Sequence, residues 1–183
     1  MPPKFNTLKI IEHILPTKDV DGLTSKNQGL LSLGIPQHIP CTPLGIMSML
    51  NSINFTFKNK TACVIGRSIL VGAPIAKLLT LNHVTVTQIH SKTLNPKAHT
   101  SQSDLIIAAA GQANLVNKDW IKKEAVVIDV GIHKIDGKLT GDTDYQTLLN
   151  KASYLTPVPG GVGPMTIASL LQNCLNAYSL HTN

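Results

Sequence analysis

The stretch from Thr61 to Ile89, TACVIGRSILVGAPIAKLLTLNHVTVTQI, decides the fold. Its first part, Thr61 to Gly66, is an apolar strand that ends in glycine, and Val71 to Leu81 has the apolar spacing of a helix. Val84 to Ile89 then has the composition of a second strand. This order is a βαβ unit, whose parallel strands are joined by a right-handed crossover. The stretch therefore predicts an open, doubly wound parallel sheet with helices on both faces.

Three short apolar runs extend this sheet downstream, at Asp104 to Ala109, Ala125 to Asp129 and Ser153 to Leu155. Runs of this length without polar alternation are typical of strands buried on both faces. The whole chain is 43% hydrophobic but only 4% aromatic, so its core must be mostly aliphatic. The predicted fold class is α/β, a Rossmann-like doubly wound sheet.

Helical spacing appears on both sides of this unit. It covers Phe5 to Leu15, before a polar turn, and Leu44 to Ile53, where Pro43 suits a first-turn position. A closing helix is predicted from Met165 to Leu180, after a Pro/Gly-rich segment that breaks all periodicity.

Composition excludes several classes of function. The net charge is +6, but the sixteen Lys and Arg residues are scattered, which favours a small anionic ligand over nucleic acid. No stretch approaches the ~18 apolar residues of a membrane span, and we expect no secretory signal, because no charged segment followed by an apolar run begins the sequence. The three cysteines form no metal or disulfide pattern. We expect a soluble, cytoplasmic protein that binds no metal, membrane or nucleic acid.

The turn from Gly66 to Gly72 joins the first strand to its helix, where backbone N–H groups can bind a phosphate. Its spacing differs from GxGxxG, so a turn without a ligand stays open as an alternative. The second strand ends in Ile89-His90-Ser91-Lys92-Thr93, without the carboxylate that would hold an NAD ribose. Arg67, Ser91 and Lys92 could instead contact a 2′-phosphate, so the pattern favours NADP, unless these residues are only a polar strand end.

Several blocks, in this order, resemble the bifunctional methylene-tetrahydrofolate dehydrogenase/methenyl-tetrahydrofolate cyclohydrolases. They are KDVDG at 18–22, PCTPLG at 40–45, GRS at 66–68, VGAP at 71–74, HSKT at 90–93, DVGI at 129–132, GD at 141–142 and TPVPGGVGPMT at 156–166. The resemblance implies an NADP-dependent enzyme of one-carbon folate metabolism and purine biosynthesis. In that family a hydride passes from the methylene bridge of the folate to NADP, and water then opens the methenyl product.

The resemblance also implies roles for single residues. It assigns Arg67 and Ser91 to the NADP 2′-phosphate. Near the cofactor phosphates it places Gly66, Ser68 and Gly72, and along the nicotinamide half it places Thr42, Ile132 and Thr166.

For the folate, the resemblance points to Asp21 and to a loop containing Pro159 and Gly160. A pterin ring presents adjacent N–H donors that one carboxylate can accept together, which suits the role of Asp21. Local sequence alone also allows Asp21 to be a solvated turn residue and the Pro/Gly block to be a linker.

One expected feature is missing: none of the three tyrosines, Tyr145, Tyr154 and Tyr178, is followed four positions later by a lysine. In the family a Tyr-x-x-x-Lys segment of an N-terminal catalytic domain supplies the general acid/base lysine. We therefore identify no certain catalytic residue. We divide the chain into a catalytic-domain remnant (1–28), an NAD(P)-binding domain (29–160) and a C-terminal helix returning toward the catalytic domain (161–183).

Three explanations follow from this gap: a fragment, a truncated gene product, or a subunit completed by another chain. The resemblance implies a homodimer formed through the cofactor domain. Without a catalytic domain, apolar residues of the opening and closing helices would be partly unpartnered: Leu8, Ile11, Leu15, Ile167, Leu170, Leu171 and Leu175. The alternative functions are a non-catalytic NADP-binding module that partners a full-length homologue, and an unrelated Rossmann dehydrogenase, against which the Pro/Gly block argues.

Overall fold

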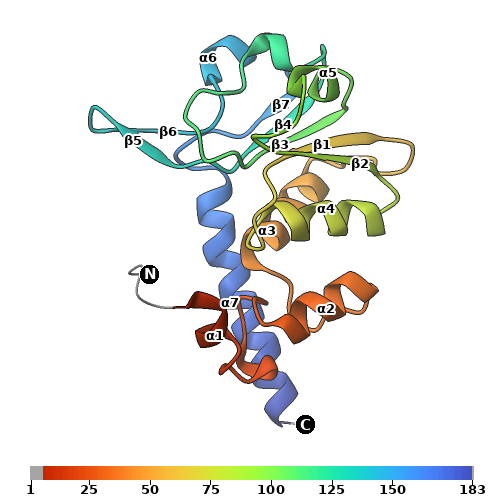
Figure 1. Ribbon diagram of the computed structural model, residues 1–183, viewed down its shortest axis with the longest axis vertical. Helices are drawn as coiled ribbons and strands as arrows, with labels where there is room; N and C mark the ends of the chain where they lie inside the picture. Colours follow the sequence, from red (N-terminus) through yellow and green to blue (C-terminus); the bar gives the residue numbers. More distant parts are fainter. Residues whose placement is uncertain (1–5, 183) are drawn as a thin grey trace.

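A five-stranded parallel sheet forms the centre of the computed structural model, which describes residues 6–182 (Figure 1). The strand order is β2-β1-β3-β4-β7, so the chain starts in the middle of the sheet and builds outward in both directions. The strands are β1 (Thr61–Ile65), β2 (Thr85–Ile89), β3 (Leu105–Ala108), β4 (Val126–Asp129) and β7 (Tyr154–Leu155). The predicted α/β, doubly wound fold is confirmed.

Helices cover both faces of the sheet (Figure 1). On one face, α3 (Cys41–Ser52) and α4 (Gly72–Leu81) pack against one set of strand residues, which includes Val64. On the other face lie α5 (Pro96–Thr100), η2 (Lys118–Trp120) and α6 (Tyr145–Leu148). There Trp120 and Leu148 pack against the strand residues whose side chains point to this second face, such as Cys63. Side chains of successive strand residues thus enter two separate aliphatic cores.

The C-terminal helix α7 (Val162–Thr182) begins at the sheet, packs along α3 and runs down to the N-terminal segment (Figure 1). It starts three residues before the predicted Met165, because Pro164 fits a first helical turn, whose N–H groups have no partner within the helix. For the same reason α3 begins at Cys41 and contains Pro43 in its first turn. Most other predicted bounds agree with the structure to one residue.

The N-terminal segment differs most from its prediction. The expected helix from Phe5 to Leu15 is only α1 (Thr7–Ile11), and residues 12–14 continue as turns. Leu15 is extended, since the residue before a proline avoids helical backbone angles, and η1 (Pro16–Lys18) follows. Residues 1–5, and Asn183 at the other end, lie outside the described residues. A helix that we did not predict, α2 (Ser25–Leu33), follows, and Thr24 caps it by accepting a hydrogen bond from the Asn27 amide.

The predicted apolar stripe is exposed on α7, where Ile167, Leu171 and Leu175 are each 63–64% accessible. On the N-terminal segment Leu8 and Leu15 are exposed too. The prediction was wrong for Ile11, which is buried, and Leu170 is half-buried.

A two-stranded antiparallel hairpin, β5 (His133–Ile135) and β6 (Lys138–Thr140), was also not predicted. Asp136 and Gly137 form its turn with φ of +48° and +79°. Two consecutive positive φ values match the tight hairpin turn that Asp-Gly favours, so this dipeptide was the available signal. The hairpin projects from the sheet at the left of Figure 1.

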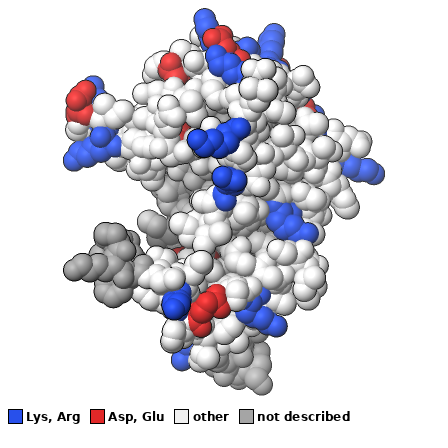
Figure 2. Space-filling model, in the orientation of Figure 1, with Lys and Arg blue, Asp and Glu red and all other residues white. Residues whose placement is uncertain are grey.

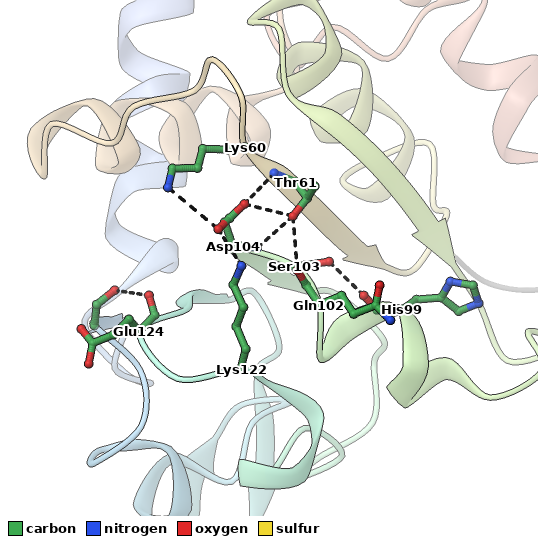
Figure 3. Close-up of polar contacts among 9 residues, drawn as sticks. Lys60, Thr61, His99, Gln102, Ser103, Asp104, Lys122 and Glu124 are labelled. Carbon is green, nitrogen blue, oxygen red and sulfur yellow. Dashed lines mark hydrogen bonds and ion pairs between the residues drawn. The ribbon is translucent and has the colours of Figure 1, made fainter.

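At the amino end of the sheet, Asp104 ties neighbouring strands together (Figure 3). Its carboxylate accepts hydrogen bonds from the Thr61 backbone N–H at 2.8 Å and from the Lys122 ammonium at 2.7 Å, with Lys60 at 3.9 Å. Partial burial alone would raise the pKa of this carboxyl, but the bonds from Lys122 and Thr61 outweigh it and lower the pKa to about 2.

We predict that Asp104→Asn lowers the free energy of unfolding by about 1–3 kcal/mol at pH 7, the scale of a hydrogen bond to a charged group. A carboxyl whose folded pKa is depressed stabilises the fold above its unfolded pKa of about 3.9. That contribution is lost as the pH falls toward the folded value of about 2. Urea unfolding should therefore show a difference from wild type at pH 6 that shrinks toward pH 2.5. A difference independent of pH would contradict the assignment.

Candidate cofactor and substrate site

Two neighbouring cavities open at the carboxyl end of the sheet, where open α/β folds bind their ligands. The first, which we name the glycine-turn pocket, has a volume of about 470 Å³. It contains four of the predicted cofactor residues, Gly66, Arg67, Ser68 and Ser91. Its other walls come from the loop after β3 and from α5 and η2, and they include His90, Thr93, Pro96, Ala109, Ala110, Gln112, Leu115 and Trp120.

The turn from Gly66 to Gly72, which gives this pocket its name, contains backbone N–H groups that make no hydrogen bond within the part of the protein that the structure describes. Among the described residues, the amides of 67–70 donate to no protein acceptor. The Ser68 hydroxyl instead accepts from the amides of Val71 at 3.2 Å and Gly72 at 3.4 Å, which orders the start of α4. Free N–H groups beside a helix N-terminus suit a phosphate. Gly72 and Lys92 do not line the pocket.

The end of β2 is held by a local turn. The His90 amide donates to Thr93 Oγ1 at 2.9 Å, and His90 Nδ1 accepts from the Lys92 amide at 3.2 Å. Ser91 thereby stays at the pocket, and no Asp or Glu is among the residues that line it. The pocket therefore has the positive, carboxylate-free lining that a 2′-phosphate requires.

The second cavity, the Pro/Gly cleft, has a volume of about 600 Å³. It brings together five predicted residues, Thr42, Ile132, Pro159, Gly160 and Thr166. Their common walls are the 157–164 segment, the first turns of α3 and α7, and the 129–132 segment after β4. At the base of the helices, the Thr42 and Thr166 hydroxyls are 3.0 Å apart, although 124 positions separate them in the sequence.

Asp21, the predicted pterin ligand, is exposed and lines neither cavity. It lies beside the thiol of Cys41, whose pKa is raised to about 12 first by burial and then by the Asp21 carboxylate. Because Cys41 precedes Thr42, Asp21 sits next to the helix turn that borders the Pro/Gly cleft.

The turn that carries Asp21 depends on a residue that sequence reasoning missed. Asp19 is buried, and its carboxylate accepts from the amides of Leu23 at 3.0 Å and Thr24 at 2.8 Å and from Asn27 Nδ2 at 2.8 Å. Burial would raise the pKa of Asp19, but these hydrogen bonds outweigh it and lower the pKa. An acidic residue next to a turn gave no sign that it would be buried.

A second missed feature is a pair of buried carboxylates between the two cavities, Asp129 and Asp142. Asp129 accepts from the amides of Gly131 (3.0 Å) and Asp142 (2.9 Å), and from the amide and hydroxyl of Thr143 (2.9 and 2.6 Å). Asp142 accepts from His133 Nε2 at 2.7 Å and from two backbone amides after β3. Burial raises the pKa of Asp129.

Gly131 and Gly141 leave the space that these two carboxylates occupy. A Cβ added at Gly131 would collide with the Asp142 carboxylate, and one added at Gly141 would collide with the Asp129 carboxylate. Each acid thus packs against the glycine next to the other, which explains why the two short blocks Asp-Val-Gly and Gly-Asp occur together.

Charge and metal-ligand geometry narrow what the site can bind. Lys and Arg side chains are spread over the face shown in Figure 2 and form no single basic patch there. Within residues 6–182, no three His, Cys, Asp or Glu side chains are grouped so as to hold a metal ion. In the same residues, no helix combines the length and apolar character of a membrane span.

Comparison with known proteins identifies the family. Residues 40–182 match the family model "Tetrahydrofolate dehydrogenase/cyclohydrolase, NAD(P)-binding domain". The chain belongs to this family. The matched region crosses the predicted boundary at residue 160 and includes α7, so the division at 28 and 160 stays a prediction.

Relatives in this family share both sequence and structure with the chain. The "Bifunctional protein FolD" of Oceanobacillus iheyensis is 51% identical over 97% of the chain, and that of Sulfurovum sp. is 47% identical over the same share. A crystal structure of the bifunctional FolD enzyme from Campylobacter jejuni covers 99% of the chain with a TM-score of 0.97 and 43% identity. The Trypanosoma brucei FolD, solved with NADP cofactor and inhibitor, covers all of it with a TM-score of 0.94 and 36% identity.

These four relatives are longer than this chain. It spans 62% of the Oceanobacillus relative, 63% of the Sulfurovum relative and 65% of each of the two solved structures.

We predict that Gly131→Ala lowers the free energy of unfolding by about 1–3 kcal/mol, the usual effect of overpacking a buried site, because the new methyl group would displace the Asp142 carboxylate. Gly29→Ala is the matched control, since this helical glycine of α2 has open space around it. The control should raise stability by about 0.5–1 kcal/mol. Thermal unfolding measures both variants, and equal effects would show that the crowding at Gly131 is unimportant.

Proposed function

We propose that this chain is the NADP-binding part of a methylene-tetrahydrofolate dehydrogenase/methenyl-tetrahydrofolate cyclohydrolase, with the cofactor lying across both cavities. The observation that carries the proposal is the side-by-side placement of two sites at the carboxyl end of one sheet. The glycine-turn pocket offers Arg67, Ser91 and free amides to phosphates. The Pro/Gly cleft offers a mostly apolar space next to it.

The adenine half of NADP would occupy the glycine-turn pocket. Arg67 has a planar fork of donors that suits a phosphate, and the Ser91 hydroxyl can donate to the same group. The unpaired amides of 67–70 would donate hydrogen bonds to the bridging phosphates. The bonds from the Val71 and Gly72 amides to the Ser68 hydroxyl would hold that turn in place. No carboxylate lines the pocket to repel a third phosphate.

We predict that Arg67→Ala weakens NADP binding about 10- to 100-fold, the scale of a lost hydrogen bond to a charged group. Affinity for NAD, which lacks the 2′-phosphate, should change by less than about 3-fold, because the other contacts remain. Isothermal titration calorimetry with both cofactors makes the comparison. Equal losses for NAD and NADP would contradict the 2′-phosphate assignment.

The nicotinamide half and the folate would meet in the Pro/Gly cleft. NADP, when bound, supplies the acceptor for the hydride from the folate methylene bridge. Thr42, Thr166 and Ile132 would hold the nicotinamide end, and Pro159 and Gly160 would lie over the folate. Asp21 would accept the adjacent N–H donors of the pterin ring, from a turn that buried Asp19 keeps in place.

The general acid/base group is the part that residues 1–183 do not contain, because no Tyr-x-x-x-Lys segment occurs in them. A positioned general acid or base contributes about 10²–10⁴-fold to a rate. The alternative function, a non-catalytic NADP-binding module, rests on this same observation. Cofactor binding and turnover therefore have to be measured separately.

We predict that residues 1–183 bind NADP but reduce it with methylene-tetrahydrofolate at a rate about 10²–10⁴-fold below that of a family member carrying the segment. Absorbance at the nicotinamide band follows the reaction in the preparation used for binding. Full-rate turnover would contradict the role of the missing lysine, and absence of turnover with retained binding would favour the non-catalytic module. Failure to bind NADP would contradict the proposed function itself.

We also propose that the assembly is a homodimer. The support is the edge strand β2, which pairs with β1 on one side only and exposes Thr85, Thr87 and Gln88. An open edge of this kind can pair with a second copy of the sheet. Light scattering would give the molar mass of two chains, and a monomer at micromolar concentration would contradict the proposal.

A further inference from the structure

The β5–β6 hairpin forms one wall of the Pro/Gly cleft. Ile132, just before β5, and Leu139, within β6, both line the cleft. Ile132 reaches across toward Gly163 in the first turn of α7, where its Cδ1 atom is 3.8 Å from the position that a Cβ would occupy. The width of the cleft at this point therefore depends on how the hairpin is oriented.

A single side-chain bond ties strand β5 to the buried carboxylates. His133 pairs with Thr140 at the base of the hairpin, and its Nε2 lies 2.7 Å from Asp142 Oδ1. The tautomer of His133 that carries its hydrogen on Nε2 can donate to this oxygen. Within the described residues, no other side chain of β5 makes a hydrogen bond.

The partner of His133 is itself rigidly held. Asp142 is fully buried, and its second oxygen accepts from the amides of Ala110 and Gly111, the latter at 2.9 Å. Ala110 lines the glycine-turn pocket. Asp142 thus contacts the backbone of the glycine-turn pocket through one oxygen and His133, at the base of the hairpin, through the other.

We infer that His133 is a positioning residue for the nicotinamide half of the cofactor, acting through the hairpin wall that it fastens to Asp142. His133 lines neither cavity, so it acts without touching the ligand. Its side chain is 24% exposed and belongs to neither aliphatic core of the sheet. The inference rests on the proposed binding of NADP across both cavities.

A ligand that contains only the adenine half of the cofactor serves as the reference for NADP binding. Adenosine 2′,5′-bisphosphate carries the groups that Arg67 and Ser91 would contact, but it has no nicotinamide to meet the hairpin wall. Removing the His133–Asp142 bond should therefore weaken NADP selectively. A general loss of folding would weaken both ligands alike.

The experiment compares His133→Ala and His133→Gln by titration with NADP and with adenosine 2′,5′-bisphosphate. For His133→Ala we expect an NADP dissociation constant about ten-fold higher, the scale of one hydrogen bond to a charged group, with the bisphosphate value unchanged. Gln places an N–H donor close to the position of Nε2, so His133→Gln should return NADP affinity to within about 3-fold of wild type. His13→Ala is the matched control, since it removes an exposed histidine bond outside both cavities.

Hydrogen–deuterium exchange of residues 131–142 gives a second reading that needs no ligand. In His133→Ala this segment should exchange faster while the β1 segment at 61–65 stays unchanged. Unaltered NADP affinity, or equal losses for NADP and the bisphosphate, would overturn the inference. If wild type binds the bisphosphate but shows no added affinity for NADP, the proposed placement of the nicotinamide fails as well. If wild type binds neither ligand, the proposed function is what fails.

Discussion

The hydrogen bonding of Asp129 and Asp142 is the constraint on which the carboxyl end of the sheet depends. A buried carboxylate is costly unless its oxygens are hydrogen-bonded, and here nearly every partner is a backbone amide or hydroxyl of a loop. The hydrogen bonds that Asp129 and Asp142 need therefore determine the paths of the loops after β3 and β4. They also determine the start of the segment after β6. Those loops contribute to the walls of both cavities, so one electrostatic requirement shapes the two cavities together.

The two ends of the sheet have different tasks. At the amino end, Asp104 joins β1, β3 and the segment before β4 through bonds that serve stability. At the carboxyl end the loops leave the backbone amides of 67–70 without an acceptor among the described residues, beside Arg67, where the proposed phosphate would bind. Parallel strands make this separation natural, since all of them point their carboxyl ends to the same edge.

Helix α7 connects the cleft to the N-terminal segment. Near its start Thr166 meets Thr42, and further along Asn173 donates to the Val20 carbonyl at 2.7 Å and the Ile39 carbonyl at 2.8 Å. The turn that holds Asp21 is thereby placed relative to the cleft by a helix more than a hundred residues away in sequence. The opposite face of α7, with Ile167, Leu171 and Leu175, remains exposed in this chain.

The sequence by itself determined the sheet and the helices α3, α4 and α7, because strand and helix periodicity depends on neighbours within a few positions. It did not reveal the short helices α5 and α6 on the other face of the sheet. Of the eleven site residues, which came mostly from the family resemblance, nine lie at the cavities. The sequence did not reveal α2, whose mixed polar sequence depends on the Thr24 cap and on packing against α4. Nor did it reveal the burial of Asp129 and Asp142, which accept hydrogen bonds from groups as far as 14 and 32 positions away in the sequence, or of Asp19, whose donors are local. Only the tertiary structure decided which carboxylates are buried, because the free-energy cost of desolvating a charge is offset by hydrogen bonds that form when the chain folds.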